Sequence, residues 1–133
     1  MMESTRSTMP SDQDTLQQNE TSALISTDKV KGTEVYNRRG DHLGEVEHLM
    51  VDKPSGKVAY AVISFGGFLG MGEERRALPW QVLTYDTNLD GYVVAADDDL
   101  LRTAPRGDSE RDYNDRDWGA RVYGHFGVPP YWG

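Results

Sequence analysis

A chain of 133 residues with 37% hydrophobic residues is long enough for one folded domain, with part of the chain outside any core. Its formal net charge of -8 disfavours binding to nucleic acid or anionic membranes, and the lack of cysteine excludes disulfides, thiolate catalysis and cysteine-based zinc sites. No apolar run approaches the ~20 residues of a transmembrane segment, and residues 1–27 hold no signal-peptide core, so we expect a cytoplasmic protein.

Residues 1–22 are rich in Ser, Thr, Gln and acidic residues and contain no aromatic residue. Such a segment buries too little apolar surface to offset the loss of chain entropy, so we predict a disordered N-terminal tail. The alternative is a tail that binds a partner. Ordered structure is expected from about residue 23, and residues 26–28 are typical of a turn or of the cap of one helical turn.

Six strands are expected between residues 33 and 95. The two longest, residues 43–51 and 58–65, form a hairpin, because the linker between them contains Pro54 and Gly56. The first of the two has mixed faces and is expected to be twisted or bulged, whereas the second is apolar on both faces and is expected to be central. Shorter strands are expected at residues 33–36, 74–78, 81–85 and 92–95.

Six short strands favour a small closed barrel, because closure leaves no unpaired edge. Pro79 cannot donate to a strand ladder, so it is expected to end the fourth strand or to lie at an edge. The aspartates at 97–99 favour the positive end of a helix dipole, so a short helix is expected to begin there. The predicted fold is therefore an all-β barrel domain over residues 23–104 with a short helix at its C-terminal end.

Residues 105–133 are expected to form a solvated linker, at about 108–117, followed by an aromatic-rich segment. Two hypotheses account for its aromatic side chains: they fold back onto the barrel, or they form an exposed motif that binds a partner. We favour folding back, because exposed tryptophan lowers solubility. The candidate interaction residues in this segment are Trp118, Tyr123, Phe126, Tyr131 and Trp132.

The loop from Gly66 to Gly72 contains four glycines that permit positive φ in a long hairpin connection. Phosphate binding is disfavoured, because no Gly-Lys-Ser/Thr sequence follows. Phe68, Leu69 and Met71 either lie under the barrel rim or form an exposed contact patch. We predict that they reach the surface and mediate a two-fold homodimer, since clustered exposed apolar residues mark interaction sites.

Two patterns resemble metal sites. Residues 86–97 match the spacing of a calcium-binding loop, but Asp97 occupies the last position in place of Glu and the flanks are expected to be strands, so a β-turn is the preferred interpretation. His42 and His48 lack a third ligand in the sequence, so an exposed turn histidine and a half-buried structural histidine are expected. We predict no metal and no cofactor.

The sequence contains no recognisable catalytic motif. No Gly-x-Ser-x-Gly motif occurs, no nucleophile has an evident base, and the carboxylates cannot be paired from their spacing. The tripeptide Arg39-Gly40-Asp41 is best explained by a β-turn. The expected function is therefore non-enzymatic.

Four motifs occur in order along the chain: residues 32–36 (GTEVY), 40–46 (GDHLGEV), 66–72 (GGFLGMG) and 78–80 (LPW). Together they resemble the PRC-barrel family, small β-barrels named after the cytoplasmic domain of the photosynthetic reaction-centre H subunit. The resemblance covers about residues 22–102 and implies the barrel fold. It transfers no residue role, because no motif fixes the position of a proton-pathway residue.

The family resemblance implies three settings: a barrel that caps the quinone side of a reaction centre, a ribosome maturation factor whose barrel binds a ribosomal protein, and free-standing small proteins, which this chain resembles most. The expected function is a protein-interaction module, an adaptor or regulatory subunit whose partner is another protein. The alternatives are a peripheral component of photosynthetic or membrane electron transport, and a barrel that binds a small ligand or calcium.

Overall fold

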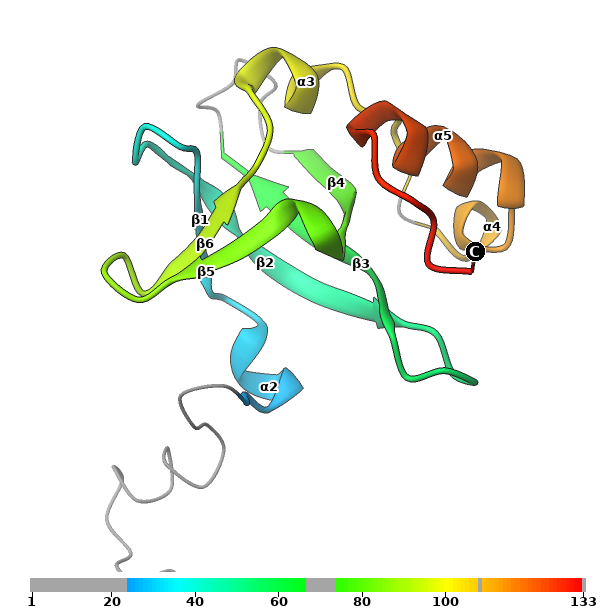
Figure 1. Ribbon diagram of the computed structural model, residues 1–133, viewed down its shortest axis with the longest axis horizontal. Coiled ribbons are helices and arrows are strands. Elements are labelled where there is room, and N and C mark those ends of the chain that lie inside the picture. The colour runs from blue at the N-terminus through cyan, green and yellow to red at the C-terminus, as the bar shows by residue number, and fades with distance from the viewer. Residues whose placement is uncertain (1–23, 67–73, 108, 133) are drawn as a thin grey trace, which may run out of the picture. The chain divides into compact units, whose positions relative to one another are not determined.

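A mixed six-stranded sheet forms the framework of residues 31–133 (Figure 1). The computed structural model describes residues 24–66, 74–107 and 109–132. The strand order is β4-β3-β2-β1-β6-β5, and all neighbours are antiparallel except β1 and β6. The strands are β1 (Glu34–Tyr36), β2 (His42–Val51), β3 (Val58–Phe65), β4 (Glu74–Pro79), β5 (Leu83–Asp86) and β6 (Gly91–Val94).

The sheet is an open half-barrel, so the prediction of a closed barrel is wrong. β4 and β5 are the two ends of the strand order. Pro79 ends β4, and it lies at a sheet edge as expected; the chain then turns through the 3-10 helix η2 (Trp80–Val82). Because Pro79 has no N–H to extend the ladder, β5 begins two residues later than predicted, at Leu83, and pairs only with β6 among the described strands.

The central position of β3 is confirmed. β3 pairs with β2 on one side and β4 on the other, and most of its side chains are buried. The bulges expected in β2 are present as register shifts after Val46 and after Met50. At Gly44 the two strands approach so closely that a Cβ would lie 1.9 Å from the Ser64 carbonyl oxygen, so only glycine fits there.

Three short helices follow the sheet: α3 (Asp98–Arg102), α4 (Glu110–Tyr113) and α5 (Arg116–Phe126). The predicted helix at residues 97–102 is confirmed, and the Asp97 side chain caps it by accepting from the Leu100 N–H at 2.8 Å. The expected linker at 108–117 instead contains α4 and the first residues of α5. Ser109 and Asp112 form a capping box for α4, and Asp115 caps α5.

The first 30 residues form a separate unit. Its described part contains the helix α2 (Thr27–Val30), in which the Lys29 N–H donates to the Ser26 carbonyl at 2.9 Å. The helical turn expected near residues 26–28 is therefore confirmed. The predicted disordered tail at residues 1–22 lies outside the described residues.

Candidate interaction site

Tyr60 of β3 is the centre of an aromatic cluster. Its ring centroid lies 5.8 Å from that of Tyr113, 5.2 Å from Trp118, 5.5 Å from Tyr123 and 6.0 Å from Tyr131. These separations are within the range of favourable aromatic pairs, each worth about 0.5–1.5 kcal/mol beyond area burial. Tyr60 is 3% exposed, so the four neighbouring rings, all from the C-terminal part of the chain, cover this face of β3.

Helix α5 packs close to β3 because Gly119, which has no side chain, lies at the contact with Tyr60. A Cβ at Gly119 would lie 2.8 Å from the Tyr60 hydroxyl oxygen and 3.0 Å from Cη2 of Trp132. Two of the buried rings have hydrogen-bonded polar atoms. The Tyr123 hydroxyl donates to the Ala59 carbonyl, and Trp118 Nε1 donates to the Arg106 carbonyl at 2.7 Å.

Residues 128–132, here called the C-terminal segment, run back across α5 (Figure 1). The Val128 N–H donates to the Tyr123 carbonyl at 3.2 Å, and Gln81 Nε2 donates to the Pro129 carbonyl at 3.2 Å. The Arg116 guanidinium lies 4.6 Å from the centroid of the Trp132 ring, a cation–π geometry. These contacts hold Tyr131 and Trp132 over the aromatic cluster.

The structure thus brings together the aromatic residues that the sequence singled out. Trp118 and Tyr123 are 2% and 1% exposed, and Phe126 and Tyr131 pack against the same cluster. Trp132 is half-buried and stacks on Tyr123 with ring centroids 5.8 Å apart. The expectation that these side chains fold back onto the barrel is therefore confirmed. The other predicted interaction residues, Phe68, Leu69 and Met71, lie outside the described residues.

A pocket of about 240 Å³ opens beside this cluster, between the β2–β3 hairpin and the C-terminal part of the chain. The end of β2, the hairpin turn and β3 supply one wall, and Tyr113 and Tyr131 supply the other. Sequence reasoning missed this pocket, because its two walls are separated by more than fifty positions in the chain. The lining residues are Met50, Val51, Asp52, Lys53, Pro54, Ala59, Tyr60, Tyr113 and Tyr131.

Burial keeps the phenols of Tyr60 and Tyr123 neutral. Burial raises the pKa of Tyr60, and the neighbouring Tyr131 and Tyr113 raise it further, while the charge of Arg116 opposes the rise. Burial likewise raises the pKa of Tyr123, with smaller contributions from Tyr60 and Tyr131. At neutral pH these hydroxyls therefore remain hydrogen-bond donors.

The residues that match a calcium loop lie in the β5–β6 hairpin. The Asp86 carboxylate accepts from the N–H groups of Asn88 and Leu89 at 2.8 and 3.2 Å, and the Tyr85 hydroxyl donates to Asp90. Asp97 caps α3. β5 ends at Asp86 and β6 lies within the matched residues, so the acidic stretch between them is a hairpin turn, as the β-turn interpretation predicted, whereas α3 follows Asp97. No group of three or more candidate metal ligands occurs in the described parts of the chain.

His48 is half-buried within β2, as expected. His42 is exposed, as expected, and lies 2.9 Å from the Glu34 carboxylate, but it is the first residue of β2 and not part of a turn. His125 Nε2 lies 2.8 Å from the Leu100 carbonyl oxygen, which joins α5 to α3.

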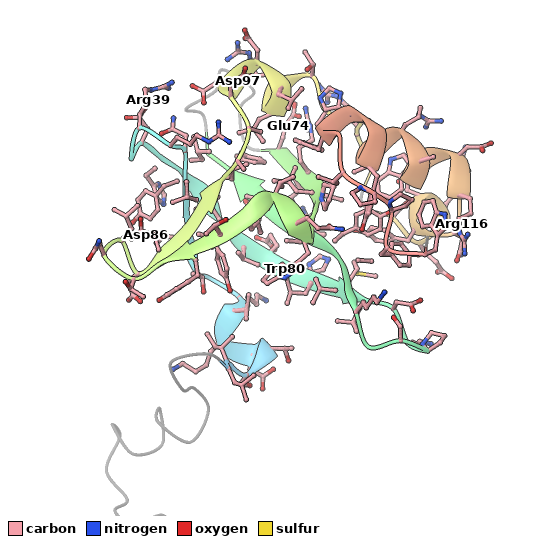
Figure 2. The ribbon with its side chains drawn as sticks, viewed as in Figure 1. Arg39, Glu74, Trp80, Asp86, Asp97 and Arg116 are labelled. Atoms are coloured by element: carbon pink, nitrogen blue, oxygen red, sulfur yellow. The ribbon has the colours of Figure 1, made fainter. Side chains whose placement is uncertain are left out.

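The Arg39-Gly40-Asp41 tripeptide is a turn that connects the barrel to α3. Arg39 pairs with Asp98 at 2.7 Å and with Asp41 at 3.1 Å, and buried Asn37 donates to both carboxylates. In Figure 2, Arg39 and Asp97 lie at the same end of the molecule. The hydrogen bond from Arg39 lowers the pKa of Asp98, although partial burial opposes the shift. A structural role accounts for all three residues of the tripeptide.

A second ion-pair group lies at the start of β4. Arg76 is 2% exposed and pairs with Glu74 at 2.5 Å, and Arg106 reaches the same carboxylate at 3.3 Å. The hydrogen bond from Arg76 lowers the pKa of Glu74. Because removal of one partner of a buried pair leaves an uncompensated charge, we assign this group to stability.

Residues 24–101 match the PRC-barrel domain family, which is more than half of the chain, so the protein belongs to the PRC-barrel family. α4, α5 and the C-terminal segment lie beyond the matched residues. None of the helices in the described ranges is long and apolar enough to cross a membrane.

One similar solved structure is that of a 16S ribosomal RNA processing protein, RimM, from Pseudomonas aeruginosa. The two share 22% sequence identity, with a TM-score of 0.39, over 56% of this chain and 45% of that chain. The chain thus spans less than half the length of that protein. No curated protein matches the chain.

Proposed function

We propose that this PRC-barrel protein is a non-enzymatic protein-interaction module, an adaptor or regulatory subunit of the cytoplasm. The observation that carries the proposal is the open pocket between the β2–β3 hairpin and the C-terminal part of the chain. At about 240 Å³ it is smaller than the ~300–1,000 Å³ typical of small-molecule sites. A pocket of this size, lined by aromatic and aliphatic side chains together with Asp52 and Lys53, suits one anchor side chain of a protein partner.

The use of polar side chains elsewhere supports a non-enzymatic role. Asp97 and Asp115 cap helices, Asp86 caps a hairpin turn, and His125 bridges two helices. These groups are engaged with backbone atoms, whereas a catalytic acid or base must face a substrate.

The charge of the chain supports a protein partner. The net charge of -8 is unfavourable for a phosphate backbone, which is the dominant source of affinity in nucleic-acid complexes. Self-association through Phe68, Leu69 and Met71 remains a prediction that rests on the composition of their loop. Light scattering of the wild type and of a Phe68→Ser, Leu69→Ser double variant tests it, and a monomeric wild type contradicts it.

Cross-linking of the full chain in an extract of its native cells tests the proposed function. Lys53 and Lys57 are exposed between β2 and β3, so their amines are accessible to amine-specific cross-linkers. We expect one protein partner, a complex of defined stoichiometry, and reassembly of that complex from the purified proteins. Recovery of the chain without any cross-linked partner contradicts the proposal. Recovery cross-linked to a membrane electron-transport complex favours the alternative function.

A further inference from the structure

The C-terminal segment is attached to α5 and the sheet mainly through side chains. Pro129 and Pro130 have no N–H group, so this part of the segment cannot join a strand ladder or continue a helix. The attachment comes from two aromatic rings, because Tyr131 and Trp132 both pack on Tyr123 with ring centroids 6.0 and 5.8 Å from its own. Side-chain contacts of this kind do not require the segment and α5 to belong to the same chain.

A single glycine reverses the chain between α5 and this segment. Gly127 has φ 70° and ψ 30°, which is the left-handed region, and it caps α5. Its N–H donates to the Gly124 carbonyl at 3.1 Å, and the Val128 N–H donates to the Tyr123 carbonyl at 3.2 Å, which is a Schellman motif. No neighbouring atom lies within 4 Å of a Cβ built at Gly127, so a substitution there changes the backbone preference without a steric clash.

The segment runs antiparallel to α5 (Figure 1). Val128 is bonded to Tyr123 near the end of the helix, whereas Trp132 lies against Gly119, one turn earlier. With Gly127 extended, the segment would instead continue in the direction of α5 and leave its own helix. Two chains related by a two-fold axis near the ends of their α5 helices can then exchange segments, because each segment meets the other helix in the same antiparallel direction.

We propose that two copies of this chain exchange their C-terminal segments when Gly127 extends, and so form a two-fold dimer. The segment of each copy then packs on α5 and on Tyr60 of the other copy, and the partner's Tyr131 supplies the second wall of the pocket. Exchange keeps the aromatic contacts of the segment and gives up the two hydrogen bonds that Gly127 and Val128 make at the end of the helix. This contact between copies goes beyond the proposed function.

The balance between the closed monomer and the exchanged dimer depends on the hinge at Gly127. Both forms contain the same aromatic contacts, so these contacts largely cancel in the comparison. A short tether gives the segment an effective concentration on the order of 1 mM for its own helix, so we expect the wild-type dimer to have a Kd of about 1 mM or higher. A side chain at position 127 disfavours the left-handed conformation about tenfold, and the dimer relieves two hinges, so its Kd falls about 100-fold.

Light scattering of the full chain tests the exchange. We expect Gly127→Val to dimerise with a Kd of about 10–100 μM, since a β-branched residue is disfavoured in the left-handed region. Gly127→Asn is expected to tighten the dimer less, because asparagine tolerates this region. Gly124→Val is the matched control, since Gly124 is exposed in α5, has open space around a built Cβ and has no positive φ. Its Kd is expected to lie within about threefold of the wild-type value.

Nuclear magnetic resonance locates the contact between copies. The sample is an equimolar mixture of isotope-labelled and unlabelled Gly127→Val chains, in which filtered NOEs report only contacts between copies. We expect such contacts between the rings of Trp132 and Tyr123, which stack in the closed chain. The hinge effect is also expected in the loop double variant, Phe68→Ser and Leu69→Ser, because the exchanged contact does not use that loop.

Four outcomes overturn the proposal. Gly127→Val stays monomeric at about 1 mM, or Gly124→Val dimerises as tightly as Gly127→Val. The Gly127→Val dimer shows no contact between Trp132 and Tyr123 of different copies, or it is lost in the loop double variant. The proposed function has a separate test, because a hetero-partner recovered by cross-linking from native cells supports it whether or not the segments exchange.

Discussion

The half-barrel and the C-terminal helices, α4 and α5, are stabilised by different kinds of interaction. The half-barrel relies on backbone ladders between strands that are mostly neighbours in sequence, with aliphatic side chains such as Val62 and Ile63 between them. The C-terminal helices have few direct backbone bonds to the sheet and are attached by aromatic rings around Tyr60. Regular pairing tolerates many sequences, whereas an aromatic contact of this kind depends on a few residues, and the pocket exists only where the two regions meet.

The largest expected effect comes from removal of the ring at the centre of the contact. Tyr60→Ala leaves a cavity between β3 and α5, so we expect a loss of about 3–5 kcal/mol of unfolding free energy. Denaturant titration measures it. Tyr85→Ala is the matched control, because Tyr85 is 39% exposed, and a loss of only about 1 kcal/mol is expected there. Equal effects at the two positions would show that Tyr60 is not central to the attachment.

A pair of glycine substitutions in α5 separates packing from helix propensity. Gly119→Gln forces a side chain against Tyr60 and Trp132, so a loss of about 1–3 kcal/mol is expected. Gly124 is exposed and has no neighbouring atom within 4 Å of a built Cβ, so Gly124→Gln is expected to gain about 0.5–1 kcal/mol. The denaturant midpoints of the two variants, compared with that of the wild type, measure both changes in stability. A gain at both positions would mean that α5 does not lie close to Tyr60.

A smaller effect is expected at alkaline pH. Because burial raises the pKa of Tyr60 and Tyr123 in the folded state, the unfolded chain releases these protons first. Their contribution to stability is complete below pH ~10 and is lost as the pH rises above it, by about 1 kcal/mol or less for each tyrosine at pH ~10.5. Unfolding titrations between pH ~9 and ~10.5 measure the slope, and Tyr60→Phe is expected to reduce it. A stability that stays constant over this range in wild type contradicts burial of the phenols.

The smallest expected effect is that of calcium. The carboxylates of Asp86 and Asp97 are engaged by backbone N–H groups in the β5–β6 hairpin and at the start of α3. We therefore expect no change in Tm with calcium at about 1 mM, since a site of that affinity or better would stabilise the folded form by mass action. A rise in Tm that is lost in Asp90→Ala would restore the calcium-binding alternative.

The contrast between the two regions also explains what the sequence could predict. The strand 58–65 was placed correctly because an apolar run between turn residues is a local signal. The open edge was missed, because Pro79 and η2 change the direction of the chain through local geometry that strand counting does not include. In α5, the spacing of Trp118, Val122 and Phe126 at i, i+4 and i+8 is a local helical signal in the sequence.

The pocket could not be predicted in the same way. Val51, Tyr113 and Tyr131 come from segments without a shared periodicity, and only the contact of Tyr60 with α5 and the C-terminal segment brings them together. Lys53 carries no distinguishing sequence signal, since a lysine in a hairpin turn is an ordinary solvated residue. The aromatic content of residues 118–132 indicates that this segment packs against the barrel, but it does not indicate that Tyr131 faces the β2–β3 hairpin across a pocket.

Because aromatic rings of α4 and α5 are packed around Tyr60 of β3, we expect these helices to fold as one cooperative unit with the half-barrel. Native-state hydrogen exchange of the full chain tests it most directly, by comparing the opening free energies of amides in α5 and β3. We expect the amides of Val122 and Tyr123 to open with the same free energy as those of Val62 and Ile63, equal to that of global unfolding. An opening free energy in α5 lower by about 2 kcal/mol or more would show a helix that detaches on its own, and would contradict the account.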